Sequence, residues 1–136
     1  MIRQVVKDVM ILSRKSVPAE KQDIPIGKDL LDTLFANAAA CVGMAANMIG
    51  INKRIIVVNT GVMNIAMFNP VIESRSGRYE TQEGCLSLSG LRPTVRYQSI
   101  FVSYMDINWK KQKLKLTGWP AQIVQHEIDH CDGIVI

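Results

Sequence analysis

Two histidines and a glutamate near the C-terminal end of the sequence have a spacing typical of metal-dependent hydrolases. His126, Glu127 and His130 form the pattern His-Glu-x-x-His. Residues four positions apart lie on one face of a helix, so both imidazoles can bind the same metal ion. Glu127 would then lie close enough to exchange protons with a water on that metal. The pattern therefore predicts metal-assisted hydrolysis. A chance match on an amphipathic helix is the competing interpretation, although these are the only two histidines in the chain.

A catalytic metal usually has three protein ligands, and Cys85 is the candidate for the third. It follows Gly84, which lets the backbone come close, and a thiolate binds a borderline metal well. The alternative is a small buried cysteine without such a role. Cys131 would point about 100° away from His130 on a helix, so we interpret it as a core residue, and Cys41 as another packing residue. A thermolysin-like protease is disfavoured because no glutamate follows the motif.

Three segments together resemble the motifs of the peptide deformylase family. Residues 41–48 are similar to its first motif, Gly-x-Gly-Leu-Ala-Ala-x-Gln. Residues 83–87, Glu-Gly-Cys-Leu-Ser, match the second motif without change. Residues 125–130 match the third, which continues to Gly133. The segments follow in the family's order, and the similarity covers nearly the whole chain.

The resemblance implies a role for each motif residue. Cys85, His126 and His130 would bind one divalent metal, Fe²⁺ in the cell, which Zn²⁺ or Ni²⁺ can replace. Glu127 would move the proton from water to the leaving amine, and the backbone amide of Leu86 would help to hold the oxyanion. The substrate would be an N-formylmethionyl peptide of a nascent protein.

The resemblance also implies a peptide-binding surface around the metal. Gly43 would pair with the substrate like an added strand. Arg96 would pair with Glu83 and brace the second motif. The residues expected to bind substrate are Gly43, Met48, Gly84 and Arg92.

The first motif departs from the family pattern at its two ends. Met48 stands where the family has glutamine, and a thioether cannot donate a hydrogen bond to an oxyanion. Loss of one such donor costs about 10²–10³ in rate. The neighbouring Asn47 is expected to face the other way in an extended segment. Cys41 replaces the first glycine of the motif. We therefore expect a deformylase with reduced activity.

The chain stops three residues after Gly133, with Ile134-Val135-Ile136 as a candidate short strand. It resembles the shorter, divergent branch of the family found in some Gram-positive bacteria. The C-terminal helix that other members have, which is associated with ribosome docking, is not expected here. The ribosome surface is nevertheless retained as a candidate partner.

Composition indicates one globular domain, residues 1–136, with 48% hydrophobic and 21% charged residues. Three cysteines are too few for a disulfide framework, and the N-terminus does not resemble a signal peptide, so a cytoplasmic protein is expected. Residues 33–52 lack charge, but their asparagines and glycines favour a buried helix and loop over a membrane span. The net charge of +4 does not call for a specific nucleic-acid partner, and Lys110–Lys113 is expected to be a solvated turn.

The periodicity of the hydrophobic residues predicts an α+β fold. Helices are expected over residues 3–14 and 28–40, and a closing helix begins near Gly118 and Pro120 and stops near Gly133. Strands are expected over residues 55–58, 67–72, 77–82, 95–105 and 113–117, with an edge or bulge at Pro70. Short connections between them favour mostly antiparallel sheets, packed around the closing helix.

Three functional hypotheses follow from the sequence. The first is a metal-dependent deformylase, with activity reduced by Met48. The second is a related amidase that acts on a different acyl group. The third is a non-catalytic protein of the same family that still binds metal or peptide.

Overall fold

The computed structural model describes residues 1–85 and 88–134; within these ranges, the side chains of residues 85, 88 and 89 are not described. Helices lie on either side of a strand-rich middle, as the sequence predicts for an α+β protein. Their bounds are α1 Val9–Leu12, η1 Lys21–Asp23, α2 Ile24–Ala36, β1 Gly43–Ala45, η2 Ala46–Ile49, β2 Ile55–Asn59, β3 Asn64–Cys85, β4 Leu88–Met105, β5 Lys111–Thr117 and α3 Trp119–Cys131. Leu86 and the last two residues of the candidate C-terminal strand lie outside the described residues.

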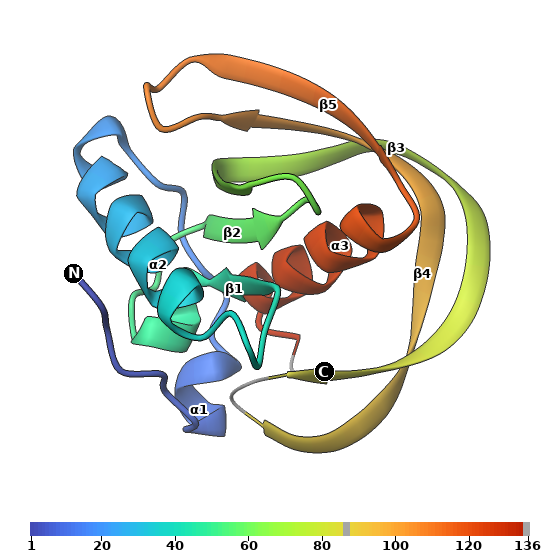
Figure 1. Ribbon diagram of the computed structural model, residues 1–136, viewed down its shortest axis with the longest axis horizontal. Coiled ribbons are helices and arrows are strands. Elements are labelled where there is room, and N and C mark those ends of the chain that lie inside the picture. The colour runs from blue at the N-terminus through green and yellow to red at the C-terminus, as the bar shows by residue number, and fades with distance from the viewer. Residues whose placement is uncertain (86–87, 135–136) are drawn as a thin grey trace.

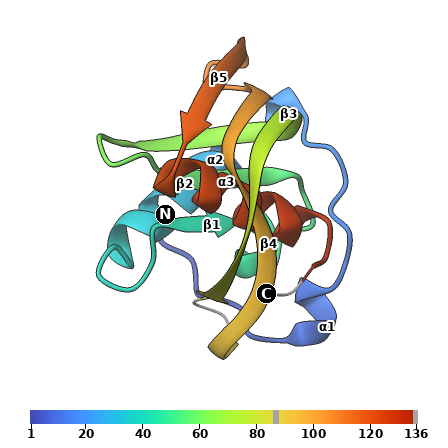
Figure 2. The same ribbon diagram turned by 90° about the vertical axis from the view of Figure 1, so that its right-hand side faces the viewer.

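The five strands form one antiparallel sheet in the order β1-β2-β3-β4-β5. β3 and β4 are long, with 22 and 18 residues, and they curve around α3 (Figures 1 and 2). Irregularities of register interrupt their pairing at three places, including the step from Phe68 to Val71. Such bulges increase the twist and let a long ribbon bend. The bulge expected at Pro70 is therefore confirmed.

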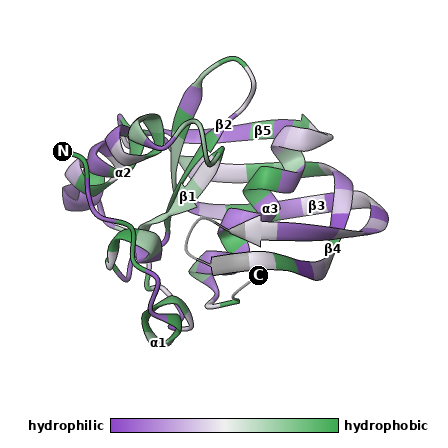
Figure 3. Ribbon diagram, turned by 60° about the horizontal axis from the view of Figure 1, so that its bottom comes forward, coloured by the Kyte–Doolittle hydropathy of each residue, from purple (hydrophilic) through white to green (hydrophobic). Residues whose placement is uncertain are grey.

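β2 is buried on both faces, which explains why its residues 55–58 are all β-branched and apolar. Ile55 and Val57 belong to a core with α2, in which Leu30 and Leu34 are buried. Ile56 and Val58 belong to a second core, with residues of α3 such as Val124. Since side chains alternate across a strand, one strand supplies both cores. Helix α3, which has both hydrophobic and hydrophilic residues in Figure 3, can thus pack on the sheet and still carry polar groups.

Two sequence-predicted helices have different bounds in the structure. The helix expected over residues 3–14 is only Val9–Leu12, because the Asp8 side chain accepts from the Met10 amide and caps a helix at that point. The preceding residues pair elsewhere; the Val6 amide, for example, donates to the Met48 carbonyl. The helix expected over residues 28–40 is Ile24–Ala36, with Pro25 in its first turn.

Two strands expected separately, over residues 67–72 and 77–82, are parts of one strand, β3. Gly77, which suggested a boundary, has a φ of 78° but stays within the ladder. No described helix is long and apolar enough to cross a membrane. The uncharged segment 33–52 contains the end of α2, then β1 and η2.

The closing helix begins and ends where the sequence predicts. Gly118 is its N-cap, Pro120 lies in its first turn, and Gly133 has the positive φ of a helix stop. Its last carbonyls are bonded by distant parts of the chain. The His130 carbonyl accepts from the Asn47 side chain, at 2.8 Å, and the Cys131 carbonyl accepts from the Ser16 amide, at 2.7 Å. The C-terminal end of α3 is therefore tied to the first third of the chain.

Candidate metal centre

Helix α3 brings the two histidines and the glutamate of the motif together on its buried side. Ligand atoms of His126, Glu127 and His130 lie within 4.8 Å of one another. The imidazole rings have centroids 5.1 Å apart and are tilted by 56°, and all three residues are buried. The spacing argument from the sequence thus describes the geometry correctly: the three residues form a candidate metal-binding group.

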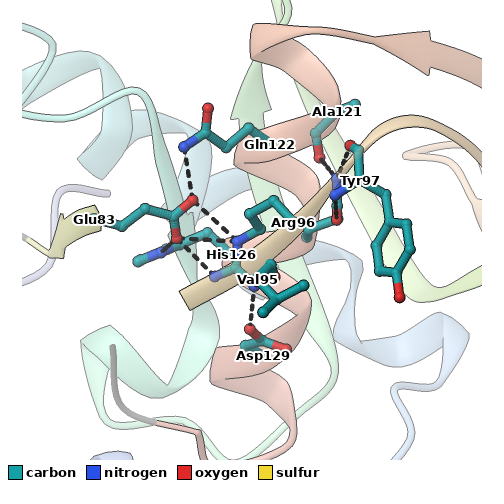
Figure 4. A network of polar contacts seen from close by, with 9 residues as sticks. Glu83, Val95, Arg96, Tyr97, Ala121, Gln122, His126 and Asp129 are labelled. Carbon is teal, nitrogen blue, oxygen red and sulfur yellow. Dashed lines mark hydrogen bonds and ion pairs between the residues drawn. The ribbon is translucent and has the colours of Figure 1, made fainter. Parts of the chain in front are cut away.

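Glu83, at the end of β3, orients the first histidine. Its carboxylate lies 2.8 Å from His126 Nδ1, and Arg96 of β4 binds the same carboxylate at 2.6 Å (Figure 4). The predicted pairing of Arg96 with Glu83 is confirmed. An ionised carboxylate can accept a hydrogen bond but cannot donate one. In a neutral His126 the ring proton is therefore on Nδ1, which donates it to Glu83. Nε2 then keeps its lone pair, the form in which a histidine binds a metal.

Two further residues of the network were not predicted from the sequence: Gln122, which lies outside the motifs, and Asp129, which lies inside the third. Gln122 donates to Glu83 Oε2 at 2.8 Å, and Asp129 accepts from Arg96 at 2.7 Å. Both lie on α3, and Figure 4 shows them on either side of the Glu83–Arg96 pair. Gln122 lies one turn before His126 and shares its face, which is the signal that could have indicated it from the sequence. The network ties α3 to both long strands at the site.

Burial and charge set the protonation of these groups in opposite directions. Burial alone would raise the pKa of Glu83, but hydrogen bonds from His126, Arg96 and Gln122 outweigh it and lower the pKa to about 2. Burial raises the pKa of Glu127 to about 7, and it lowers that of His130 to about 3. His130 is therefore neutral at physiological pH and suited to bind a metal, while Glu127 can take up and release a proton near neutrality.

A cavity of about 680 Å³ opens beside this group. Gly43, Met48 and Gly84 line it together with His126 and Glu127, and their roles toward substrate stay predictions. A β-carbon on Gly43 would lie 2.7 Å from Ile123 and 2.9 Å from Glu127, so a larger residue there would force these side chains to shift. β1, which carries Gly43, is the edge strand of the sheet. It therefore has an edge where an added strand can pair.

Arg92 is placed differently from the other expected substrate-binding residues. It lies opposite Glu83 in the β3–β4 ladder and is partly buried, but it does not belong to the described lining of the cavity. Its Nη1 atom is buried without a described hydrogen-bond partner. A role for Arg92 toward substrate stays a prediction.

Met48 lies in the short helix η2, not in the extended segment expected from the sequence. The Ala45 amide donates to its sulfur, at 3.4 Å, and the turn buries the side chain at the cavity wall. Asn47 does face away, as expected, because its amide donates to the carbonyls of Leu12 and His130. The position of Met48 therefore offers the cavity an acceptor but no donor.

The three cysteines have different surroundings. Cys131 is fully buried in the α3 core, where burial raises the pKa of its thiol to about 12; its interpretation as a core residue is confirmed. Cys41 packs against the α2 core as expected, and it also lines the cavity. Cys85 ends β3, where its backbone pairs with Leu88. Its side chain, and all of Leu86, lie outside the described residues, so the roles predicted for both stay predictions.

Comparison with known proteins identifies the family. The sequence model of the polypeptide deformylase family matches residues 2–136. The chain belongs to the peptide deformylase family. A peptide deformylase of Clostridium beijerinckii is 51% identical over the full length of both chains. One from Pelotomaculum thermopropionicum is 40% identical and covers 89% of this chain, with 78% of its own length aligned.

Solved structures of the family have the same fold. Peptide deformylase from Thermus thermophilus superposes with a TM-score of 0.86 at 37% identity, covering 99% of this chain and 83% of its own. A class I type b peptide deformylase from Acinetobacter baumannii, solved with actinonin bound, superposes with a TM-score of 0.87 at 28% identity. The match covers 99% of this chain and 95% of the Acinetobacter chain. The structure of the Acinetobacter enzyme with Met-Ala-Ser bound superposes with a TM-score of 0.86 at 26% identity. This match covers 99% of this chain and 97% of the Acinetobacter chain. Family and fold together support a deformylase function.

Proposed function

We propose that this protein removes the N-formyl group from N-formylmethionyl peptides of nascent proteins by metal-dependent hydrolysis. The observation that carries the proposal is the buried group of His126, Glu127 and His130 at the wall of a cavity, with His126 held by Glu83. Peptide deformylase is the family activity, and a relative from Acinetobacter baumannii has been solved with Met-Ala-Ser, a peptide that begins with methionine.

The residues present fit a divalent metal. His130 is neutral, His126 has its Nδ1 engaged by a carboxylate, and both rings belong to one buried group. We assign His126, His130 and Cys85 as the ligands, with Fe²⁺ as the metal in the cell and Zn²⁺ or Ni²⁺ as replacements. When bound, such an ion acts as a Lewis acid that makes hydroxide available near neutral pH and polarises the formyl carbonyl.

The chain's own residues would then move protons and hold the substrate. Glu127, with a pKa raised by burial to about 7, takes a proton from the attacking water and passes it to the leaving amine. Gly43, on an edge strand, pairs with the peptide backbone, Gly84 lines the same cavity, and Arg92 contacts the peptide from outside the described lining. The Leu86 amide donates to the oxyanion. Residues 1–136 form a single domain for this task, in the cytoplasm, with the ribosome surface as a further candidate partner.

Met48 is the residue that sets the expected rate. A glutamine at this position would donate a hydrogen bond to the oxyanion, and the loss of one such donor costs about 10²–10³ in kcat. The same observation favours a second candidate function, in which the protein binds metal and peptide but does not hydrolyse formyl peptides, or acts on another acyl group.

An anaerobic assay with formyl-Met-Ala-Ser and Fe²⁺, with metal analysis of the same sample, tests the proposal. Wild-type turnover is expected, slow but measurable, and Glu127→Ala should abolish it while the metal content is retained. Met48→Gln should raise kcat, and Met48→Leu, which restores no donor, should not. No turnover by wild type or Met48→Gln, with metal bound in both, would support the second candidate instead.

A further inference from the structure

A basic surface lies on the outside of the sheet, away from the candidate metal centre. Lys113 and Lys115 of β5 hold their ammonium groups over the ring of Phe101, on β4, at 5.7 and 5.9 Å from its centroid. Lys111 lies on the same face of β5, since alternate side chains along a strand point the same way, and it is exposed as well. We call the group Phe101, Lys111, Lys113 and Lys115 the basic surface.

The alternation of side chains along β4 and β5 points this surface outward. Ile100 pairs with Leu116 and Val102 pairs with Leu114, and all four belong to the core beneath α3. The residues between them point to the opposite face of the sheet. Phe101, Lys113 and Lys115 therefore lie on the convex side of the ribbon that curves around α3 (Figure 1). The ring of Phe101 remains accessible there, with 39% of the residue exposed.

The cations of the basic surface are not neutralised by neighbouring carboxylates. Among the ion pairs between described residues, none involves Lys111, Lys113 or Lys115. The acid beside them is Glu73, whose carboxylate accepts from the Ser103 hydroxyl. With that carboxylate counted, the basic surface carries three positive charges and one negative charge, in a chain whose net charge is +4. This concentration of charge is complementary to a polyanion.

The basic surface also has a hollow with hydrogen-bonding groups. A depression of about 280 Å³ is lined by Ser74, Ser76 and Ser99 together with Arg75, Phe101 and Lys115. It shares no lining residue with the cavity at the metal centre. Hydroxyls and cations beside an accessible ring offer contacts for phosphates and for a flat base in the same place.

We propose that the basic surface binds single-stranded RNA without sequence preference. Cations that follow a phosphate backbone, beside an aromatic ring on which a base can stack, are the elements of such sites. An anionic membrane is a poorer match, because the apolar side chains exposed on this face, Phe101 and Val71, offer only a small area for insertion. Lysines on an edge strand can also serve to prevent another strand from pairing with the sheet. That role would not require an accessible aromatic ring beside the lysines. The proposal does not depend on the deformylase activity.

Binding of the purified protein to a labelled oligouridine of about a dozen nucleotides tests the proposal, by fluorescence anisotropy at several salt concentrations. Three phosphate contacts predict that the logarithm of the binding constant falls with the logarithm of salt with a slope of about −2. Lys113→Glu with Lys115→Glu should weaken binding at least about tenfold and flatten the slope. The matched control, Lys7→Glu with Lys28→Glu, makes the same change of net charge at two exposed lysines elsewhere, and it should change binding less than about twofold.

Phe101→Ala tests the stacking contact and should weaken binding about tenfold, whereas Phe101→Tyr should retain it. Thermal melts establish that each variant is folded, and all of them should hydrolyse formyl peptides as the wild type does. Equal losses in the two double variants would show a general charge effect and overturn the proposal. So would the absence of RNA binding by the wild type at about 0.1 M salt, or stronger, Lys113- and Lys115-dependent binding to phosphatidylglycerol vesicles.

Discussion

Replacing Glu83 with glutamine removes one charge from a buried carboxylate that has three hydrogen-bonding partners, while keeping the shape of the side chain. Glu83 accepts from Arg96, Gln122 and His126, and Arg96 is itself buried with 4% of its surface exposed. In Glu83→Gln the Arg96 guanidinium keeps only Asp129 as an anionic partner. Breaking a buried ion pair in this way typically costs about 3–5 kcal/mol.

The pKa of Glu83 gives a second, independent magnitude. Its reduction from an ordinary value of 4.5 to about 2 corresponds to about 3 kcal/mol of stability at pH 7. A carboxyl group whose pKa is lower in the folded state contributes fully above its unfolded pKa, near 4.5, and loses that contribution as the pH falls toward 2. The difference between wild type and Glu83→Gln should therefore be about 3 kcal/mol at pH 7 and roughly half of that at pH 3.

Urea denaturation at both pH values, with and without a chelator, measures this difference. The chelated samples separate the ion-pair network from the contribution of a bound metal. Glu80→Gln is the matched control, because Glu80 lies on the same strand, its side chain is 79% exposed, and its pairing with Arg78 is loose, at 3.7 Å. That variant should lower the free energy of unfolding by less than about 1 kcal/mol. A Glu83→Gln cost as small as the control's, or one independent of pH, would refute the reasoning.

Three further predictions concern single positions. Gly43→Ala places a β-carbon against Ile123 and Glu127 and should lower formyl-peptide kcat/KM at least about tenfold with little change in the melting temperature; an unchanged kcat/KM would contradict the close approach seen at this strand. Asn47→Ala removes the amide that donates to the His130 and Leu12 carbonyls and should destabilise the protein by about 1–3 kcal/mol in urea titrations; a neutral result would mean that these carbonyls find other donors. Gly133→Ala should destabilise the protein more than Gly61→Ala. Both glycines have a positive φ, but only at Gly133 would the new β-carbon overlap the Ser13 carbonyl. Equal melting temperatures of the two variants would show that this overlap has no effect on stability.

Features that depend on a few neighbouring residues could be predicted well from the sequence. The closing helix has its glycine and proline signals at both ends, and the motif histidines share a face whatever the rest of the chain does. The buried strand over residues 55–58 could be predicted because β2 is covered on both faces and needs no polar alternation. The pairing of Arg96 with Glu83 came from the family resemblance, because thirteen residues separate the two.

Features set by distant contacts could not be predicted in this way. Residues 3–8 carry a helical pattern but pair with η2 and α2 instead, as the Val6–Met48 hydrogen bond shows. The bend of Met48 into a short helix depends on local turn geometry that its apolar neighbours do not indicate. Gln122 and Asp129 join the site only because β3 and β4 pass beside α3, 39 and 33 residues from their partners along the chain.

The hydrogen bonds that tie the end of α3 to Ser16 and Asn47 also bear on when the metal can be acquired. His130 is held by a partner 83 residues away in the sequence, so its environment exists only after the two halves of the chain have come together. A half-folded chain would lack the Glu83 carboxylate that orients His126, and it would bind cations more weakly. Uptake of the proposed metal should thus accompany folding of the whole domain, which would limit capture of the wrong ion by immature protein.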